Sequence, residues 1–175
     1  MSKENSKNKK LIIVGDSAFA EIAHLYFAED SEYEVVAFSV EKKYLKSDEY
    51  KGLPVYAFED LSSILDPKEH HIFVAIVYTD LNRLRKRLMD ESKDKGYMLA
   101  SYISKNSYIA SNVEIGEHCF VFENNTIQPY VKIFDNVVLW SGNHIGHHSV
   151  ISSNCFLSSQ VVLSGFCNVG EYSFI

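Results

Sequence analysis

The sequence lacks any long apolar run, and this absence excludes two classes of protein. No stretch approaches the about 18 apolar residues of a membrane-spanning helix, so no membrane span is expected. Residues 11–14 form the first apolar run, which is too short for the core of a signal peptide and ends at Gly15 and Asp16. A cytoplasmic location is therefore expected.

An excess of positive charge is also missing, because 17 lysine and arginine residues stand against 23 aspartate and glutamate residues. The net charge of -6 argues against a nucleic-acid partner, since phosphate backbones bind concentrated positive surfaces. Cysteine is scarce as well. Only Cys119, Cys155 and Cys167 are present, and an odd number without a secretion signal indicates free thiols.

The first half of the chain, residues 1–102, alternates strand and helix patterns. Strands are predicted at residues 10–14, 34–40 and 72–77. One helix is predicted after Ser17, which can cap it, and another over residues 80–92, with Leu81, Leu84 and Leu88 on one face. This order predicts a parallel sheet with helices outside it.

The second half, residues 103–175, has a strict six-residue period that neither a helix nor an ordinary strand produces. Every sixth residue is Ile, Leu or Val, at Ile103, Ile109, Ile115, Val121, Ile127, Ile133, Leu139, Ile145, Ile151, Leu157, Leu163, Val169 and Ile175. A β-helix has this period, with one short strand and one corner in each unit and the aliphatic side chain pointing inward.

A second interior column lies two residues before each aliphatic position and contains all three cysteines. They are therefore interpreted as inert core residues. If three units make one coil, Cys119 and Cys155 are two coils, or roughly 9–10 Å, apart, which is too far for a disulfide. The same register predicts a buried ladder of Asn125 and Asn143.

The register also predicts an outward stack of Phe122 and Trp140, eighteen residues apart. An outward aromatic stack requires a cover. Either a subunit interface or the N-terminal half of the chain could supply it.

This pattern resembles the left-handed β-helix acyltransferases, and most of all the sialic acid O-acetyltransferases and bacterial UDP-4-amino-sugar N-acetyltransferases. The resemblance begins at Leu11-Ile12-Ile13-Val14-Gly15 and is strongest at Gly142-Asn143-His144-Ile145-Gly146-His147-His148-Ser149-Val150-Ile151. It implies an α/β Rossmann-like nucleotide-sugar-binding domain at residues 1–102 and a left-handed parallel β-helix acyltransferase domain at residues 103–175. It also implies a homotrimer that needs no metal and transfers acetyl from acetyl-CoA to an amino or hydroxyl group of a nucleotide-linked sugar, for surface glycan biosynthesis.

Acetyl transfer requires a base for the acceptor, stabilisation of the thioester oxygen, and close positioning of both substrates. The resemblance assigns the base to His147. His148 stands where relatives often have an acidic residue, and it is either a passive neighbour or the group that orients His147. Glu123 is a possible acidic substitute. Phe156 stands where some relatives have a second histidine.

Two further sets of residues follow from the register and the resemblance. Gly165 lies eighteen residues after His147, at the same corner, and the resemblance gives its backbone amide the contact with the thioester carbonyl. Ser164 is a weaker candidate for coenzyme binding. His144 is a candidate for substrate binding.

Gly15, Asp16 and Ser17 lie between a predicted strand and helix, a context that suits a phosphate group of the nucleotide sugar. Only the first glycine of a glycine-rich loop is kept, which argues against an NAD-type dinucleotide. The basic run at residues 83–87 is interpreted as a solvated helix face, with a diphosphate clamp as the alternative. Three histidines, His24, His70 and His71, are expected at the surface.

The chain stops in mid-pattern at Ile175, and relatives usually continue through more coils. A C-terminally short β-helix of this kind is expected to be truncated or covered by a partner, and to bind acetyl-CoA weakly. Two other functions stay open. One is a zinc enzyme of the γ-carbonic-anhydrase kind that uses His144, His147 and His148, and the other is a non-catalytic trimeric nucleotide-sugar-binding scaffold.

Overall fold

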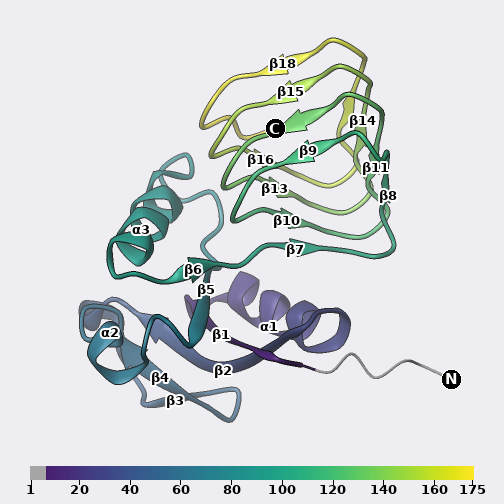
Figure 1. The fold of residues 1–175 in the computed structure, drawn as a ribbon. Coiled ribbons are helices and arrows are strands. Elements are labelled where there is room, and N and C mark those ends of the chain that lie inside the picture. Colours follow the sequence, from purple (N-terminus) through teal and green to yellow (C-terminus); the bar gives the residue numbers. More distant parts are fainter. Residues whose placement is uncertain (1–6) are drawn as a thin grey trace, which may run out of the picture. The chain divides into compact units, whose positions relative to one another are not determined.

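A computed structural model describes residues 7–175, which form two compact units (Figure 1). The first unit contains the described residues up to Ile76 together with Leu88–Ala100, and the second contains Val77–Arg87 and Ser101–Ile175. The segment Val77–Arg87, which precedes the predicted domain boundary, thus groups with the repeats. Within residues 7–175, the helices are too short or too polar to cross a membrane.

The first unit is built on a six-stranded sheet with the order β3-β4-β2-β1-β5-β6. All neighbours are parallel except β3 and β4. The strands are β1 (Lys9–Val14), β2 (Tyr33–Val40), β3 (Glu49–Tyr50), β4 (Leu53–Ala57), β5 (His70–Val74) and β6 (Met98–Leu99). Its helical elements are α1 (Ala18–Asp30), the 3-10 turn η1 (Lys42–Tyr44) and α2 (Leu61–Ile64). Helix α3 (Arg83–Asp94) is divided between the units after Arg87. The predicted parallel sheet is confirmed.

Two predictions for this region are wrong. His70 begins strand β5, which has a neighbouring strand on each side, and it is only 6% exposed. Its ring Nδ1 lies 2.9 Å from the carbonyl oxygen of Asp66. His24 and His71 are half-buried, and burial lowers the pKa of both. Helix α3 starts at Arg83 rather than at residue 80. The three residues before it have φ values of 51°, 47° and 67°, which no right-handed helix accepts. Leu81 is consequently 54% exposed.

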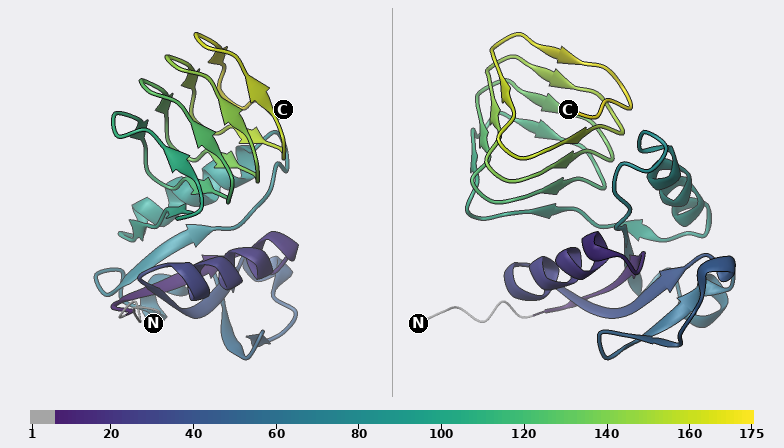
Figure 2. Two further views of the ribbon diagram at one scale, coloured as in Figure 1. Left: turned by 90° about the vertical axis from the view of Figure 1, so that its right-hand side faces the viewer. Right: turned by 180° about the vertical axis from the view of Figure 1, so that it is seen from behind.

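The second unit consists of three four-stranded parallel sheets, each built from strands eighteen residues apart. The first sheet contains β7 (Tyr102–Ile103), β10 (Phe120–Val121), β13 (Val138–Leu139) and β16 (Phe156–Leu157). The second contains β8 (Tyr108–Ile109), β11 (Thr126–Ile127), β14 (His144–Ile145) and β17 (Val162–Leu163). The third contains β9 (Glu114–Ile115), β12 (Lys132–Ile133), β15 (Val150–Ile151) and β18 (Asn168–Val169). Figure 2 shows the stacked turns, whose repeated pattern fits a left-handed β-helix.

The corners of the coils recur every six residues in a left-handed backbone conformation. The values of φ run from 57° to 65° at His118, Asn124, Tyr130, Asn136, His148, Asn154, Gln160, Phe166 and Tyr172, and φ reaches 78° at Gly142. Asparagine and histidine tolerate this conformation better than most side chains, and glycine accepts it without strain. Corners with the same backbone therefore line each edge of the prism.

The predicted aliphatic column forms the core of this unit, with Val121, Ile127, Leu139, Ile145 and Leu157 fully buried. The column is less protected at the first and last positions of the series. There, a coil stacks on one side only, and Ile103 and Ile175 are 40% and 41% exposed.

The second interior column, predicted to contain the three cysteines and the asparagine ladder, is confirmed in most respects. Cys119 and Cys155 are buried, Cys167 is half-buried, and all three thiols are free. Burial raises the pKa of Cys119 to about 12, so this thiol is unreactive. In the amide ladder, the backbone N–H of Asn143 donates to Oδ1 of Asn125 at 3.2 Å.

The predicted aromatic stack is also present on the outward face. The rings of Phe122 and Trp140 lie 4.2 Å apart, and Trp140 is followed by Phe156 at 5.7 Å. Tyr78 packs edge-on against Phe156 at 5.6 Å. A subunit interface over the rest of this face stays a prediction.

Candidate functional site

His147 follows strand β14 and precedes the corner at His148. Its backbone N–H donates to Oε1 of Gln128 at 2.9 Å, and its carbonyl oxygen accepts from the N–H of Phe166 at 2.9 Å. The coils on both sides therefore fix the backbone, while the imidazole is exposed.

The imidazole of His147 lies directly over Gly165, one coil further along the chain, as the eighteen-residue register predicts. A β-carbon at Gly165 would come within 2.7 Å of Cε1 and 2.8 Å of Nε2 of this ring. Any side chain at residue 165 would thus displace the imidazole, although the φ of Gly165 is one that other residues accept.

The backbone N–H of Gly165 has no hydrogen-bond acceptor among the residues that the structure describes. One coil earlier, the matching N–H of His147 is taken by the side chain of Gln128. The residue that would play this part for Gly165 is Gly146, which has no side chain. A β-carbon at Gly146 would also come within 2.5 Å of the Gly165 nitrogen. Two glycines thus leave one N–H open beside the imidazole.

His148 lies at the corner itself, between two aromatic rings. Its ring centroid is 4.6 Å from that of Tyr130 and 4.9 Å from that of Phe166, both in stacked geometry. Its Nδ1 atom lies 3.1 Å from Nδ1 of His147. His148 therefore meets His147 directly through Nδ1, and Nε2 of His147 takes no part in this contact.

The other residues predicted near this site have different surroundings. His144 is half-buried on β14 between Thr126 and Val162, and within the described chain no contact joins its ring to that of His147. Ser164 is exposed, and its carbonyl oxygen accepts from Oγ of Ser149 at 3.0 Å. Glu123 lies beside the corner at Asn124, on another edge of the prism from His147.

The histidine at another corner, His118, is excluded as a base by its environment. It is 1% exposed, and its Nδ1 lies 2.9 Å from Oδ1 of Asn136. Burial lowers its pKa to about 3. A ring of this kind stays neutral and has no access to a substrate.

Gly15, Asp16 and Ser17 lie in the first unit, between β1 and α1. Gly15 is buried with a φ of 127°, and its N–H donates to the carbonyl oxygen of Ser39 at 2.8 Å. Asp16 and Ser17 are exposed. Ser17 occupies the N-cap position but makes no side-chain cap, so the predicted cap is wrong. The backbone N–H groups in the first turn of α1 therefore make no hydrogen bond to the side chain of Ser17.

The basic run at residues 83–87 is not the uniformly solvated face that the sequence predicts. Arg85 is fully buried, and its Nε donates to Oδ1 of Asn136 at 2.8 Å while Nη2 donates to the carbonyl oxygen of Asn136 at 3.0 Å. Burial lowers the pKa of Arg85 to about 10, so it stays charged. Arg85 joins the first turn of α3 to the coils and is not available to a diphosphate.

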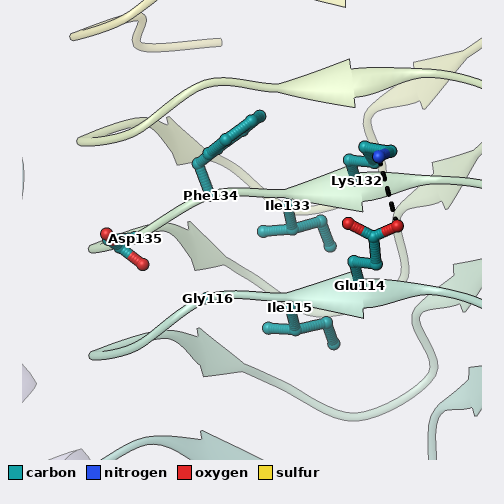
Figure 3. A pocket seen from close by; sticks show the side chains of 7 residues that line it. All are labelled: Glu114, Ile115, Gly116, Lys132, Ile133, Phe134 and Asp135. Carbon is teal, nitrogen blue, oxygen red and sulfur yellow. Dashed lines mark ion pairs between the residues drawn. The ribbon is translucent and has the colours of Figure 1, made fainter.

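A pocket of about 210 Å³ lies on β9 and β12, where Glu114 and Lys132 form an ion pair at 3.1 Å (Figure 3). Gly116, Phe134 and Asp135 also line it, and none of the predicted site residues does. Across residues 7–175, no three His, Cys, Asp or Glu side chains are grouped so as to hold a metal ion.

Comparison with known proteins identifies the fold. No family model matches the chain, and no curated protein matches its sequence. Among solved structures, the acetyltransferase domain of PglB from Neisseria gonorrhoeae matches with a TM-score of 0.82 and 21% identity, covering 96% of this chain and 80% of that one. The chain has the fold of this acetyltransferase domain.

Two further structures agree. A histidine-to-asparagine mutant of perosamine N-acetyltransferase from Caulobacter crescentus, in complex with CoA and GDP-perosamine, matches with a TM-score of 0.79 and 24% identity, covering 94% of this chain and 76% of that one. WeeI from Acinetobacter baumannii matches with a TM-score of 0.54 and 18% identity, covering 93% and 94%. At these identities, the likeness establishes the fold.

Proposed function

We propose that this protein transfers an acetyl group from acetyl-CoA to an amino or hydroxyl group of a nucleotide-linked sugar, in the biosynthesis of a surface glycan. The observation that carries the proposal is the imidazole of His147 over Gly165, whose backbone N–H has no acceptor among the described residues. A base and an oxyanion donor at one point are what acyl transfer from a thioester requires.

In the proposed reaction, the nitrogen or oxygen of the acceptor sugar attacks the thioester carbonyl carbon. His147 takes the acceptor's proton on Nε2, and the N–H of Gly165 donates to the carbonyl oxygen as it becomes negative. The carbon–sulfur bond then breaks, and the CoA thiolate leaves with the proton from His147. The products are the acetylated sugar and CoA with a free thiol.

The substrate assignment rests on the first unit and on the likeness to the perosamine N-acetyltransferase, which is described in complex with CoA and GDP-perosamine. We assign the first unit to a Rossmann-like nucleotide-sugar-binding domain. The exposed start of α1 at Asp16 and Ser17 would accept a phosphate group on its backbone N–H groups. His144 and Ser164 are assigned to substrate and coenzyme contacts, and a homotrimer is the proposed assembly.

The test is a thiol-release assay. The purified protein is mixed with acetyl-CoA and a panel of amino and hydroxy nucleotide sugars, and a mass increase of one acetyl group on the sugar is measured in parallel. Thiol release that depends on one of the sugars supports the proposal. Sugar binding without thiol release would instead indicate a non-catalytic scaffold, and stoichiometric zinc in the purified protein would indicate a metalloenzyme.

A further inference from the structure

One edge of the β-helix has a column of three exposed rings, formed by Tyr130, His148 and Phe166. The rings are stacked at 4.6 and 4.9 Å with interplanar angles of 26° and 17°. Tyr130 is 58% exposed and Phe166 is 69% exposed, so burial in the core does not explain the column. The middle ring of the column makes the Nδ1 to Nδ1 contact with His147.

We infer that His148 is a positioning residue that holds His147 with a proton on Nδ1, and that Tyr130 and Phe166 hold His148 in place by stacking. This inference rests on the proposed function, in which Nε2 of His147 is the base. His148 would take the place of the backbone carbonyl or carboxylate that often accepts from the other ring nitrogen of such a histidine.

The proton count supports this role. A contact of 3.1 Å between two imidazole nitrogens needs one proton between them, so one ring donates and the other accepts. If His147 donates from Nδ1, its Nε2 is unprotonated and can take a proton from the acceptor sugar. If His148 donates instead, Nε2 of His147 already has its proton and cannot act as a base. Only the first arrangement serves the reaction.

The aromatic column also suits the charge that develops during the reaction. When Nε2 of His147 takes a proton, the pair holds one positive charge with the Nδ1 proton shared between two rings. The faces of Tyr130 and Phe166 can stabilise the part of this charge that resides on His148. A second added proton would set two N–H groups against each other and break the contact.

The groups that face His148 are few. His147 lies beside it, Tyr130 is the titratable group on the preceding coil, and Phe166 faces it from the following coil. The backbone N–H of His148 donates to the carbonyl oxygen of Pro129 at 3.1 Å. The two rings and this backbone hydrogen bond therefore hold His148 so that its Nδ1 meets His147.

The kinetic test compares substitutions at the pair and along the column. His148→Ala is expected to lower kcat by about 10- to 100-fold and to leave KM for both substrates nearly unchanged. His148→Asp restores an acceptor for the Nδ1 proton and is expected to recover most of kcat. An unchanged kcat in His148→Ala, or an effect on KM alone, would overturn the inference.

Substitutions along the column have a matched control. Tyr130→Leu and Phe166→Leu are each expected to lower kcat by about 3- to 10-fold, because they remove a stacking face but keep an apolar side chain. Tyr172→Leu makes the same change at a corner with a φ of 60°, against 65° at Tyr130, on another edge of the prism. It is expected to leave kcat unchanged. Equal losses in Tyr130→Leu and Tyr172→Leu would contradict a specific role for the column.

A spectroscopic measurement separates this inference from the proposed function. In protein with ¹⁵N-labelled histidine, we expect nitrogen shifts that assign the proton of neutral His147 to Nδ1, and we expect His148→Ala to lose this preference. A proton on Nε2 of His147 in the unchanged protein would overturn the inference. If no sugar is acetylated, the proposed function fails, and the nitrogen shifts still decide whether the pair exists.

Discussion

Two edges of the same β-helix place histidines at equivalent corners and give them opposite environments. His118 and His148 have φ values of 57° and 58°, and each lies at the same position of its six-residue unit. His118 is 1% exposed, with Nδ1 2.9 Å from Oδ1 of Asn136. His148 is exposed and stacks between two aromatic rings.

The difference between the edges comes from what packs against each of them. Along the buried edge, Nδ2 of Asn136 donates to Oδ1 of Asn154 at 2.8 Å, and Arg85 adds its guanidinium to the same ladder. Along the exposed edge, nothing in the second unit covers Tyr130 or Phe166, which are 58% and 69% exposed. The repeat thus sets the backbone conformation of each corner, whereas the residues that pack against a corner set the exposure of its side chain.

The largest expected effect is at the exposed edge. His147→Ala should lower acetyl transfer by about 10²–10⁴-fold, because the general base is lost. Nucleotide-sugar binding and the thermal midpoint should persist, since the side chain is exposed. The rate is measured by thiol release and binding by calorimetry. A rate within a few-fold of the unchanged protein would remove His147 from the mechanism.

A smaller loss is expected when a methyl group is placed under the imidazole. Gly165→Ala puts a β-carbon within 2.7 Å of the His147 ring, so the ring must move, and kcat should fall by about 10- to 100-fold. Gly170→Ala is the matched control on the same coil, because nothing lies within 4 Å of its added carbon. Equal activity of the two variants would show that the position of the ring is unimportant.

At the buried edge, the expected effect is on stability. Arg85→Met removes the hydrogen bonds to Asn136 and to the carbonyl oxygen of Cys155, and should lower the free energy of unfolding by about 2–4 kcal/mol. Arg83→Met is the control. Arg83 is exposed, with its guanidinium carbon 4.7 Å from the ring centroid of Tyr172, and its loss should cost less than about 1 kcal/mol. Urea unfolding of both variants measures the difference, and similar midpoints would contradict this account of Arg85.

The smallest expected effect is a change in the pH dependence of stability. The folded pKa of His118 is lowered to about 3, below its ordinary value of 6.5, so only the unfolded chain binds this proton between these values. Stability should therefore fall as the pH decreases, by about 2 kcal/mol from pH 7 to pH 5 for this group. His118→Asn suits the left-handed corner and should remove this part of the slope. Parallel stability curves for the two proteins would mean that His118 binds its proton in the fold.

The six-residue period predicted the coils, the aliphatic core and the placement of Gly165 next to His147, because residues eighteen apart stack on each other in this β-helix. The same counting could not separate His118 from His148, since both hold the same position in the repeat. The burial of Arg85 depends on Asn136, which is 51 residues away, and no local pattern shows it. The open N–H of Gly165 could have been predicted by comparing Gly146, which has no side chain, with Gln128, which lies eighteen residues earlier and accepts from the N–H of His147.

The central claim is that a thioester carbonyl meets the N–H of Gly165 beside Nε2 of His147. A crystal structure of the protein with an unreactive analogue of acetyl-CoA tests it most directly. The account predicts the carbonyl oxygen at about 2.7–3.1 Å from the Gly165 nitrogen, with Nε2 of His147 facing the side from which the acceptor attacks. An analogue bound with its carbonyl away from Gly165, or an imidazole turned so that Nε2 points elsewhere, would contradict it.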